Sequence, residues 1–143
     1  MAADRVLLVD DEESFLEALA ERLRMRGLEV VCAKSGREAL TQVETQVFDA
    51  VVLDLAMPGL DGLETLRRLR QLQPELQVMI LSGRATVQTA VEATRLGATD
   101  IFEKPTEGDT LVQRIRSARA ARLAREAETT QQHIDEIMRS KGW

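Results

Sequence analysis

Short apolar runs alternate with longer amphipathic stretches along this chain. The runs are rich in Val, Ile and Leu, and they occupy residues 6–9, 28–32, 50–53, 78–81 and 100–102. Continuous apolar runs of this length are typical of strands buried on both faces, as in a parallel sheet, although a short buried helix has the same pattern. We interpret them as five strands because the segments between them have a helical period.

Each run is followed by a stretch with one apolar helical face. The first covers residues 13–26 and ends at Gly27, and the second begins with Ser35 and Glu38 in the spacing of a capping box. The other three stretches are marked by Leu63, Leu66, Leu69 and Leu72 before Pro74, by Val87, Ala90, Val91 and Thr94 before Gly97, and by Leu111, Ile115 and Ala118.

A strand and a helix repeated five times predict an α/β fold with a parallel sheet, right-handed crossovers and helices on both faces. In such sheets the functional site lies beyond the carboxyl ends of the strands, near a switch in strand order. The positions of interest are therefore those that directly follow Val9, Leu53, Leu81 and Phe102.

Composition narrows the classes of protein and of site. The 143 residues suit one domain with 20–30 residues left over, and the net charge of -5 gives no general attraction to nucleic acid. A single cysteine, Cys32, and a single histidine, His133, exclude an internal disulfide, a cysteine-based zinc site and a multi-histidine site. No apolar run reaches the roughly 18 residues of a membrane span, so we expect a cytoplasmic protein.

Charged and hydroxyl side chains follow four of the predicted strands. These are Asp10 and Asp11, then Asp54, Ser82 and Lys104. Taken singly, each has an ordinary explanation as a turn residue or helix cap. Together, three converging carboxylates repel one another and therefore require a counter-cation. Oxygen ligands suit a hard divalent ion, and a divalent ion that also binds phosphate points to Mg²⁺. With an ammonium and a hydroxyl added, the set forms a receptor for a phosphoryl group, and Asp54 is the candidate nucleophile.

At these residues the chain resembles the receiver domain of two-component response regulators. The matching stretches are residues 6–12 (VLLVDDE), 54–62 (DLAMPGLDG), 81–83 (LSG) and 97–105 (GATDIFEKP), within a resemblance that covers about residues 4–118. The resemblance implies a doubly wound, flavodoxin-like sheet of order 2-1-3-4-5, like that of the chemotaxis regulators. We expect a receiver domain over residues 1–118 and a helical extension over residues 119–143.

The resemblance also implies a role for each site residue. Asp54 is the phospho-acceptor, and Asp54, Asp11 and the backbone carbonyl of Ala56 bind Mg²⁺ directly, while Asp10 acts mainly through water. Ser82 turns its hydroxyl toward the phosphoryl group, and Lys104 pairs with a phosphoryl oxygen. Two further positions complete the set: Phe102 as the aromatic switch and Pro105, whose peptide bond is expected to be cis.

In this scheme phosphorylation shifts the population between two shapes of the surface formed by the fourth helix, fifth strand and fifth helix. Because Phe102 has no hydroxyl, we expect its movement to be steric and only loosely two-state. The expected donor is the phosphohistidine of a sensor histidine kinase or of a phosphotransfer protein. The downstream effector cannot be named, and neither nucleic acid nor a membrane is an expected partner.

The last 25 or so residues leave more than one interpretation open. An alanine-rich stretch favours continuation of the fifth helix. Residues 129–132 have a lower helix propensity and are a candidate for a break in that helix. Ile134, Ile137 and Met138 form a small apolar face, sparse for a coiled coil. The extension is either a solvated tail or a helix that packs on a partner or a second copy, and a homodimer through the fourth helix–fifth strand–fifth helix surface is the other candidate. The chain is either a stand-alone receiver or part of a longer regulator.

Two other functions compete with the signalling switch. A Mg²⁺-dependent phosphohydrolase of the haloacid-dehalogenase type also uses an aspartyl nucleophile, but it needs a second acid two residues later, where this chain has Ala56. A constitutive interaction module would not need all of the acidic, hydroxyl and ammonium groups together. We therefore expect no turnover of external substrates, only phosphorylation and dephosphorylation of the chain itself. A dinucleotide-binding domain is disfavoured because no G-x-G-x-x-G follows the first strand.

Overall fold

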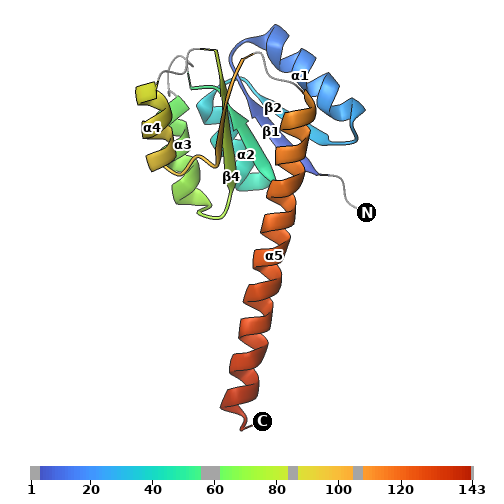
Figure 1. Cartoon of the computed structure of the whole chain (residues 1–143), viewed down its shortest axis with the longest axis vertical. Coiled ribbons are helices and arrows are strands. Elements are labelled where there is room, and N and C mark those ends of the chain that lie inside the picture. Colours follow the sequence, from blue (N-terminus) through green and yellow to red (C-terminus); the bar gives the residue numbers. More distant parts are fainter. Residues whose placement is uncertain (1–3, 56–61, 84–86, 105–107, 143) are drawn as a thin grey trace.

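The computed structural model describes residues 4–55, 62–83, 87–104 and 108–142. Five parallel strands form one sheet of order β2-β1-β3-β4-β5, which confirms the predicted fold and strand order. Each strand is followed by a helix (Figure 1). The elements are β1 Arg5–Val9, α1 Glu13–Met25, β2 Glu29–Ala33, α2 Gly36–Thr45, β3 Ala50–Leu53, α3 Gly62–Leu72, β4 Gln77–Ser82, α4 Val87–Arg95, β5 Asp100–Glu103 and α5 Gly108–Ser140.

The sheet divides the interior into two apolar cores. Because successive side chains of a strand point to opposite faces, Val6 and Leu8 enter one core and Leu7 and Val9 the other. The first core is covered by α1 and α5, and the second by α2, α3 and α4 (Figure 1). Both faces of the sheet are therefore shielded, as a parallel sheet requires.

The strands do not all share the expected burial. Strands β1, β3 and β4 are buried almost throughout, but β5 has no fully buried residue and β2 has exposed and half-buried positions. The prediction of two buried faces is therefore right for the three central strands and holds only in part for the two edge strands, whose side chains enter both cores but are less buried. An edge strand has a neighbour on one side only, and the helices cover it incompletely.

The predicted helix ends are present. The hydroxyl of Ser35 accepts a hydrogen bond from the backbone N–H of Glu38 at 3.2 Å, and the Glu38 carboxylate accepts one from the N–H of Lys34. Helices α1 and α4 are followed by Gly27 and Gly97 in the left-handed conformation, at φ +88° and +102°. Glycine takes this conformation without the steric cost of a side chain.

Helix α4 shows where a periodic pattern misleads. Val87 and Val91, which marked its apolar face, are 84% and 47% exposed, and Ala93 is its only buried residue. A helical period shows that one face is apolar, but a neighbouring element must be present to bury that face.

Helix α5 is longer than the body of the molecule requires. It runs without interruption through residues 129–132, and its carboxyl-terminal half projects from the body (Figure 1). Its buried residues are Leu111, Val112, Ile115 and Ala118, all in the first third of the helix. Within the described part of the chain, no helix combines the length and hydropathy needed to cross a membrane.

Candidate functional site

The register of the central strands brings the predicted residues to one edge of the sheet. Val9 of β1 pairs with Leu53 of β3, so the residues that follow them lie side by side. The backbone N–H of Asp54 donates to the carbonyl of Val9 at 2.9 Å, and that of Lys104 donates to the carbonyl of Ser82 at 3.2 Å. Backbone hydrogen bonds therefore place these side chains.

Three carboxylates converge at this edge. Asp10, Asp11 and Asp54 each offer an oxygen, and these oxygens all lie within 4.8 Å of one another. Asp10 and Asp54 are only 4% and 6% exposed, whereas Asp11 is open to solvent. Hard oxygen ligands at this spacing fit a divalent cation such as Mg²⁺, and the open side leaves room for water or a phosphoryl oxygen.

Lys104 supplies the positive charge of this cluster. Its Nζ lies 2.6 Å from Oδ2 of Asp10, 3.7 Å from Oε2 of Glu12 and 4.0 Å from Oδ2 of Asp54. The same ammonium stands 4.0 Å from the ring centroid of Phe15, a cation–π contact. One ammonium thus serves several acids, and the ring of Phe15 holds it in place.

The surroundings of Asp10 disfavour its charge. Burial raises the pKa of this carboxyl above its ordinary value, and the nearby charge of Asp54 raises it further. A hydrogen bond from Lys104 and one from the backbone N–H of Glu12, 2.9 Å long, act in the opposite direction without cancelling the rise. A cation bound between the carboxylates would stabilise the ionised form, so the cluster is prepared for a positive ligand.

Ser82 and Phe102 lie on neighbouring strands. Ser82 ends β4 and is 1% exposed, and it pairs across the sheet with Glu103, the residue after Phe102. Phe102 is half-buried against the core that α1 and α5 cover. Two other predicted site residues, Ala56 and Pro105, fall outside the described residues.

Gly62 is a structural requirement of the site that the sequence analysis did not identify. A Cβ at this position would lie 2.2 Å from Cα of Leu55 and 2.5 Å from the backbone oxygen of Asp54. The start of α3 therefore packs directly on the backbone beside the acid, and only glycine leaves room for it. The glycine stands in the stretch that carries the resemblance, but nothing local shows which backbone it meets.

The contact of Phe15 with Lys104 is a second feature of the site that the sequence did not predict. The pattern assigned it to the apolar face of the first helix, and it does pack beside the core. Its contact with Lys104 joins two residues that are far apart in the sequence. Periodicity within one helix carries no information about such a contact.

Comparisons with known proteins agree with this geometry. The sequence profile of the response regulator receiver domain matches residues 6–116. The transcriptional regulatory protein ZraR of Escherichia coli (strain K12) is 41% identical over 124 residues, which are 87% of this chain and 28% of that protein. The chain thus spans little more than a quarter of the length of this relative.

Solved structures extend the likeness to the fold. A CheY-like response regulator receiver domain protein from Methanospirillum hungatei JF-1 matches with a TM-score of 0.82 at 25% identity, over 87% of this chain and 99% of that one. A response regulator from Burkholderia pseudomallei, solved with a phosphorylated aspartic acid, calcium and citrate, matches with a TM-score of 0.75 at 27% identity, over 97% and 86% of the two chains. This chain belongs to the response regulator receiver family, whose general function is a phosphorylation switch in two-component signalling.

Proposed function

We propose that this chain accepts a phosphoryl group on Asp54 and that Mg²⁺ assists the transfer. The observation that carries the proposal is the convergence of Asp10, Asp11 and Asp54 around the single ammonium of Lys104. Asp10, Asp11 and Asp54 would hold the ion, together with the expected carbonyl of Ala56. When bound, Mg²⁺ neutralises charge on the transferring group.

The chemical step is attack by a carboxylate oxygen of Asp54 on the phosphorus of a phosphohistidine. The new O–P bond forms as the P–N bond breaks, and the electron pair of that bond returns to the imidazole of the donor, which takes up a proton. The 4.0 Å distance between Nζ of Lys104 and Oδ2 of Asp54 supports a role for this ammonium in pairing with a phosphoryl oxygen. The ammonium already lies at the site, so little reorganisation is required.

The switch begins with Ser82. Phosphorylation changes the single negative charge of Asp54 to about -1.5 to -2 and adds acceptor oxygens. Rotation of the Ser82 hydroxyl toward those oxygens vacates space that Phe102, on the neighbouring strand, can enter. The surface formed by α4, β5 and α5 then changes shape. Val87 and Val91 on α4 are already exposed there, which suits a surface that binds a partner.

The expected partners are a sensor histidine kinase or phosphotransfer protein as donor and an effector downstream. The Burkholderia pseudomallei relative, solved with a phosphorylated aspartic acid and calcium, supports both the acceptor and the divalent site. The Escherichia coli relative is a transcriptional regulator, and only its receiver-like portion corresponds to this chain. We assign the receiver function to residues 1–118 and treat residues 119–143 as an extension.

The proposed chemistry is confined to the chain's own phosphoryl group. A phosphohydrolase of the aspartyl-nucleophile type needs a second acid two residues after the nucleophile, and Ala56 supplies none. Turnover of small phosphoesters should therefore be negligible.

The test is incubation with acetyl phosphate and Mg²⁺. The wild-type chain should gain a hydroxylamine-sensitive phosphoryl group, and Asp54→Asn should gain none. Lys104→Ala should retain Mg²⁺ binding but show a much smaller change of the α4–β5–α5 surface on addition of beryllofluoride. Equal labelling of wild type and Asp54→Asn would refute the assignment of the acceptor.

A further inference from the structure

Apolar packing holds only the first part of α5 against the body. The buried residues of this helix end at Ala118, and beyond that point three residues of its described part are half-buried while all the others are exposed. The three are Arg119, Arg122 and Arg125. Because they are spaced three residues apart, they lie along one side of the helix. Beyond Ala118, therefore, charged side chains attach α5 to the body, and no apolar side chain in the described part of the helix is buried.

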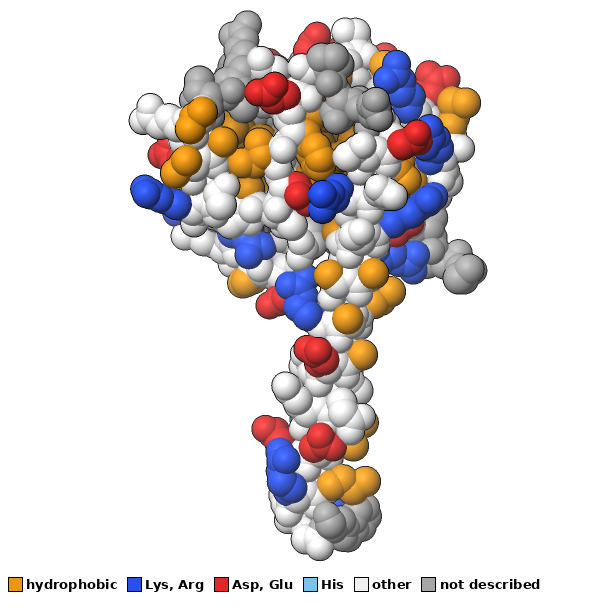
Figure 2. All heavy atoms as spheres, in the orientation of Figure 1, with side chains coloured by type: hydrophobic (Ala, Val, Ile, Leu, Met, Phe, Trp, Pro, Cys, Tyr) orange, Lys and Arg blue, Asp and Glu red, His pale blue; other side chains and the backbone are white. Residues whose placement is uncertain are grey.

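The remainder of α5 stands clear of the body. Every residue from Glu126 to Ser140 is exposed, and Figure 2 shows this part of the helix projecting with no other element beside it. A helical segment of this length spans roughly 22 Å. The direction of the projecting part is therefore set by the contacts made where α5 leaves the body.

The pair of Arg122 with Asp49 is the buried one among these contacts. Nε and Nη2 of Arg122 lie 3.0 and 2.7 Å from Oδ1 of Asp49, and the two side chains are 25% and 4% exposed. Two donors on one carboxylate oxygen restrict the orientation of the guanidinium. Breaking such a pair leaves a buried carboxylate without its partner, which is strongly unfavourable.

Asp49 is itself anchored at the base of the sheet. The backbone N–H of Arg5 in β1 donates to Oδ2 of Asp49 at 2.8 Å, and the N–H of Asp49 donates to the carbonyl of Arg5 at 2.8 Å. Arg122 also donates from Nη1 to Oε1 of Glu126, one turn later, at 2.8 Å. Since Glu126 belongs to the same helix as Arg122, only the contact with Asp49 can orient α5 relative to the strands.

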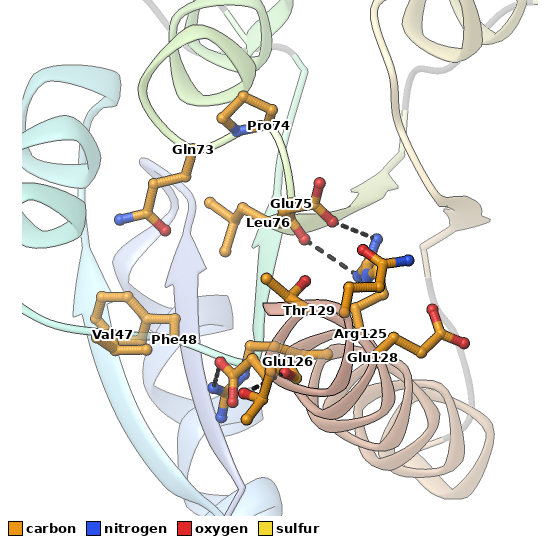
Figure 3. Close-up of a pocket in the computed structure, with 13 residues that line it drawn as sticks. Val47, Phe48, Gln73, Pro74, Glu75, Leu76, Arg125, Glu126, Glu128 and Thr129 are labelled. Carbon is orange, nitrogen blue, oxygen red and sulfur yellow. Dashed lines mark hydrogen bonds and ion pairs between the residues drawn. The ribbon is translucent and has the colours of Figure 1, made fainter. Parts of the chain in front are cut away.

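Arg125 makes a weaker attachment. It pairs with Glu75 at 2.8 Å beside a groove of about 690 Å³, whose lining includes Val47 and Phe48 (Figure 3). The side chains of this pair are 41% and 71% exposed, so water and salt screen it. The groove leaves α5 without close packing on this side, so a change in the direction of the helix has no apolar contact to break there.

We propose that Arg122 and Asp49 form a latch that fixes the direction of the projecting part of α5. With the latch closed, the helix extends as a rigid arm in the observed direction. With the latch open, the arm pivots near Ala118, where apolar packing ends. His133 lies roughly 22 Å beyond Ala118, so a swing of about 20° would move it by about 8 Å.

The latch lies at the amino end of β3 and requires no phosphoryl group. It is therefore independent of the proposed function of Asp54. Asp54→Asn should hold the arm as the wild type does, so a failure of the phosphorylation test and a failure of this proposal are separate results.

The experiment measures the distance between two spin labels by electron paramagnetic resonance in a Cys32→Ala background. The labels are attached at Glu44→Cys on α2 and at His133→Cys, both exposed positions. With the latch intact, the distance distribution should be narrow. Asp49→Asn with Arg122→Met opens the latch without leaving an unpaired buried charge, and it should broaden the distribution by about 8 Å, the displacement expected for a swing of about 20°.

Two control variants remove the other ion pairs of this region. Glu126→Gln removes the acid that pairs with Arg122 within the helix, and Arg125→Ala removes the exposed pair, and both should keep the narrow distribution. Circular dichroism should show equal helix content in all variants. An unchanged distribution in the Asp49 and Arg122 double variant would overturn the proposal, and so would a broad distribution in the wild type or an equal broadening in either control. A loss of helix content in the double variant would also overturn it, because the pair would then hold the helix itself and not its direction.

Discussion

Strand β3 has a buried aspartate at each end, and the two have opposite surroundings. Asp49, 3% exposed, directly precedes the strand and accepts hydrogen bonds from the N–H of Arg5 at 2.8 Å and from Arg122 at 2.7 and 3.0 Å. Asp54, 6% exposed, directly follows the strand and lies among other carboxylates, with the ammonium of Lys104 4.0 Å away.

The difference separates a structural acid from a reactive one. At Asp49 a guanidinium places two donors on one carboxylate oxygen and the backbone serves the other, and this carboxylate in turn raises the pKa of Arg122. At Asp54 the acids of the cluster outnumber the ammonium. Excess negative charge at a buried site is unfavourable by itself and becomes favourable when a cation binds. The Asp54 end of β3 is therefore suited to binding a cation and to a chemical reaction.

Arg122→Ala should have the largest effect on stability. It leaves Asp49 buried without its guanidinium partner, which should lower the free energy of unfolding by about 3 kcal/mol. Urea denaturation measures the loss. Replacing both residues, as Asp49→Asn with Arg122→Met, should recover most of it, and phosphorylation of Asp54 should stay unchanged in both variants. A large fall in phosphorylation would show that the two ends of β3 are not independent.

Gly62→Ala should disturb the reactive end. The new Cβ has no room beside Leu55 and Asp54, so α3 must shift, at about 2 kcal/mol of stability. Labelling by acetyl phosphate should slow at the same time. Gly108→Ala is the matched control, because a Cβ there meets nothing within 4 Å. If both variants behave alike, close packing at Gly62 is not a requirement of the site.

Asp10→Asn should stabilise the protein in the absence of Mg²⁺, by on the order of 1 kcal/mol, because it removes a buried charge from the cluster. It should also reduce the rise in melting temperature that Mg²⁺ produces. Asp11→Asn, at the exposed member of the cluster, should reduce the Mg²⁺ effect without the gain in stability.

The raised pKa of Asp10 also determines the direction in which the stability of the metal-free protein changes with pH. The pKa of Asp10 is higher in the folded protein than its ordinary value of 3.8, so over this range the folded state holds more protons. The contribution of Asp10 to metal-free stability should therefore fall as pH rises from about the ordinary value through the raised one, and stay constant above it. Comparing wild type with Asp10→Asn across this range isolates the contribution. If the contribution of Asp10 to stability increased as pH rises over this range, the predicted direction would be wrong.

Arg125→Ala should have the smallest effect. The pair with Glu75 is exposed to solvent, with 41% and 71% of the two side chains accessible, so its loss should cost no more than about 0.5 kcal/mol. The cost should shrink further in high salt, whereas that of Arg122→Ala should persist. Equal losses for the two arginines would mean that burial does not distinguish them.

Much of the fold could be predicted because its signals are local. The apolar runs marked the five strands, and Ser35, Gly27 and Gly97 marked helix ends that depend on a few neighbouring residues. The exposure of Val87 could not be predicted in the same way, because it depends on what packs against α4. The edge positions of β2 and β5 follow from the order of the sheet, which the family resemblance implied but which local periodicity does not contain.

The site was predictable only in part. Parallel strands carry their carboxyl ends to one edge, so Asp10, Asp54, Ser82 and Lys104 could be expected to meet, and they do. The contact of Lys104 with Phe15 joins distant segments, and no motif records it. Their chemical roles remain predictions for the experiments above.

The sequence by itself determined the alternation of strands and helices, the edge of the sheet where charge gathers and the residues gathered there, because these follow from short-range periodicity and from the direction of parallel strands. Only the tertiary structure decided that Asp49 pairs with Arg122, 73 residues away. This pair attaches one side of α5 to the body, while the side that carries Leu123, Ile134 and Ile137 is exposed to solvent. Such pairings are selected by burial, since a charge removed from water must find its partner wherever the fold brings one.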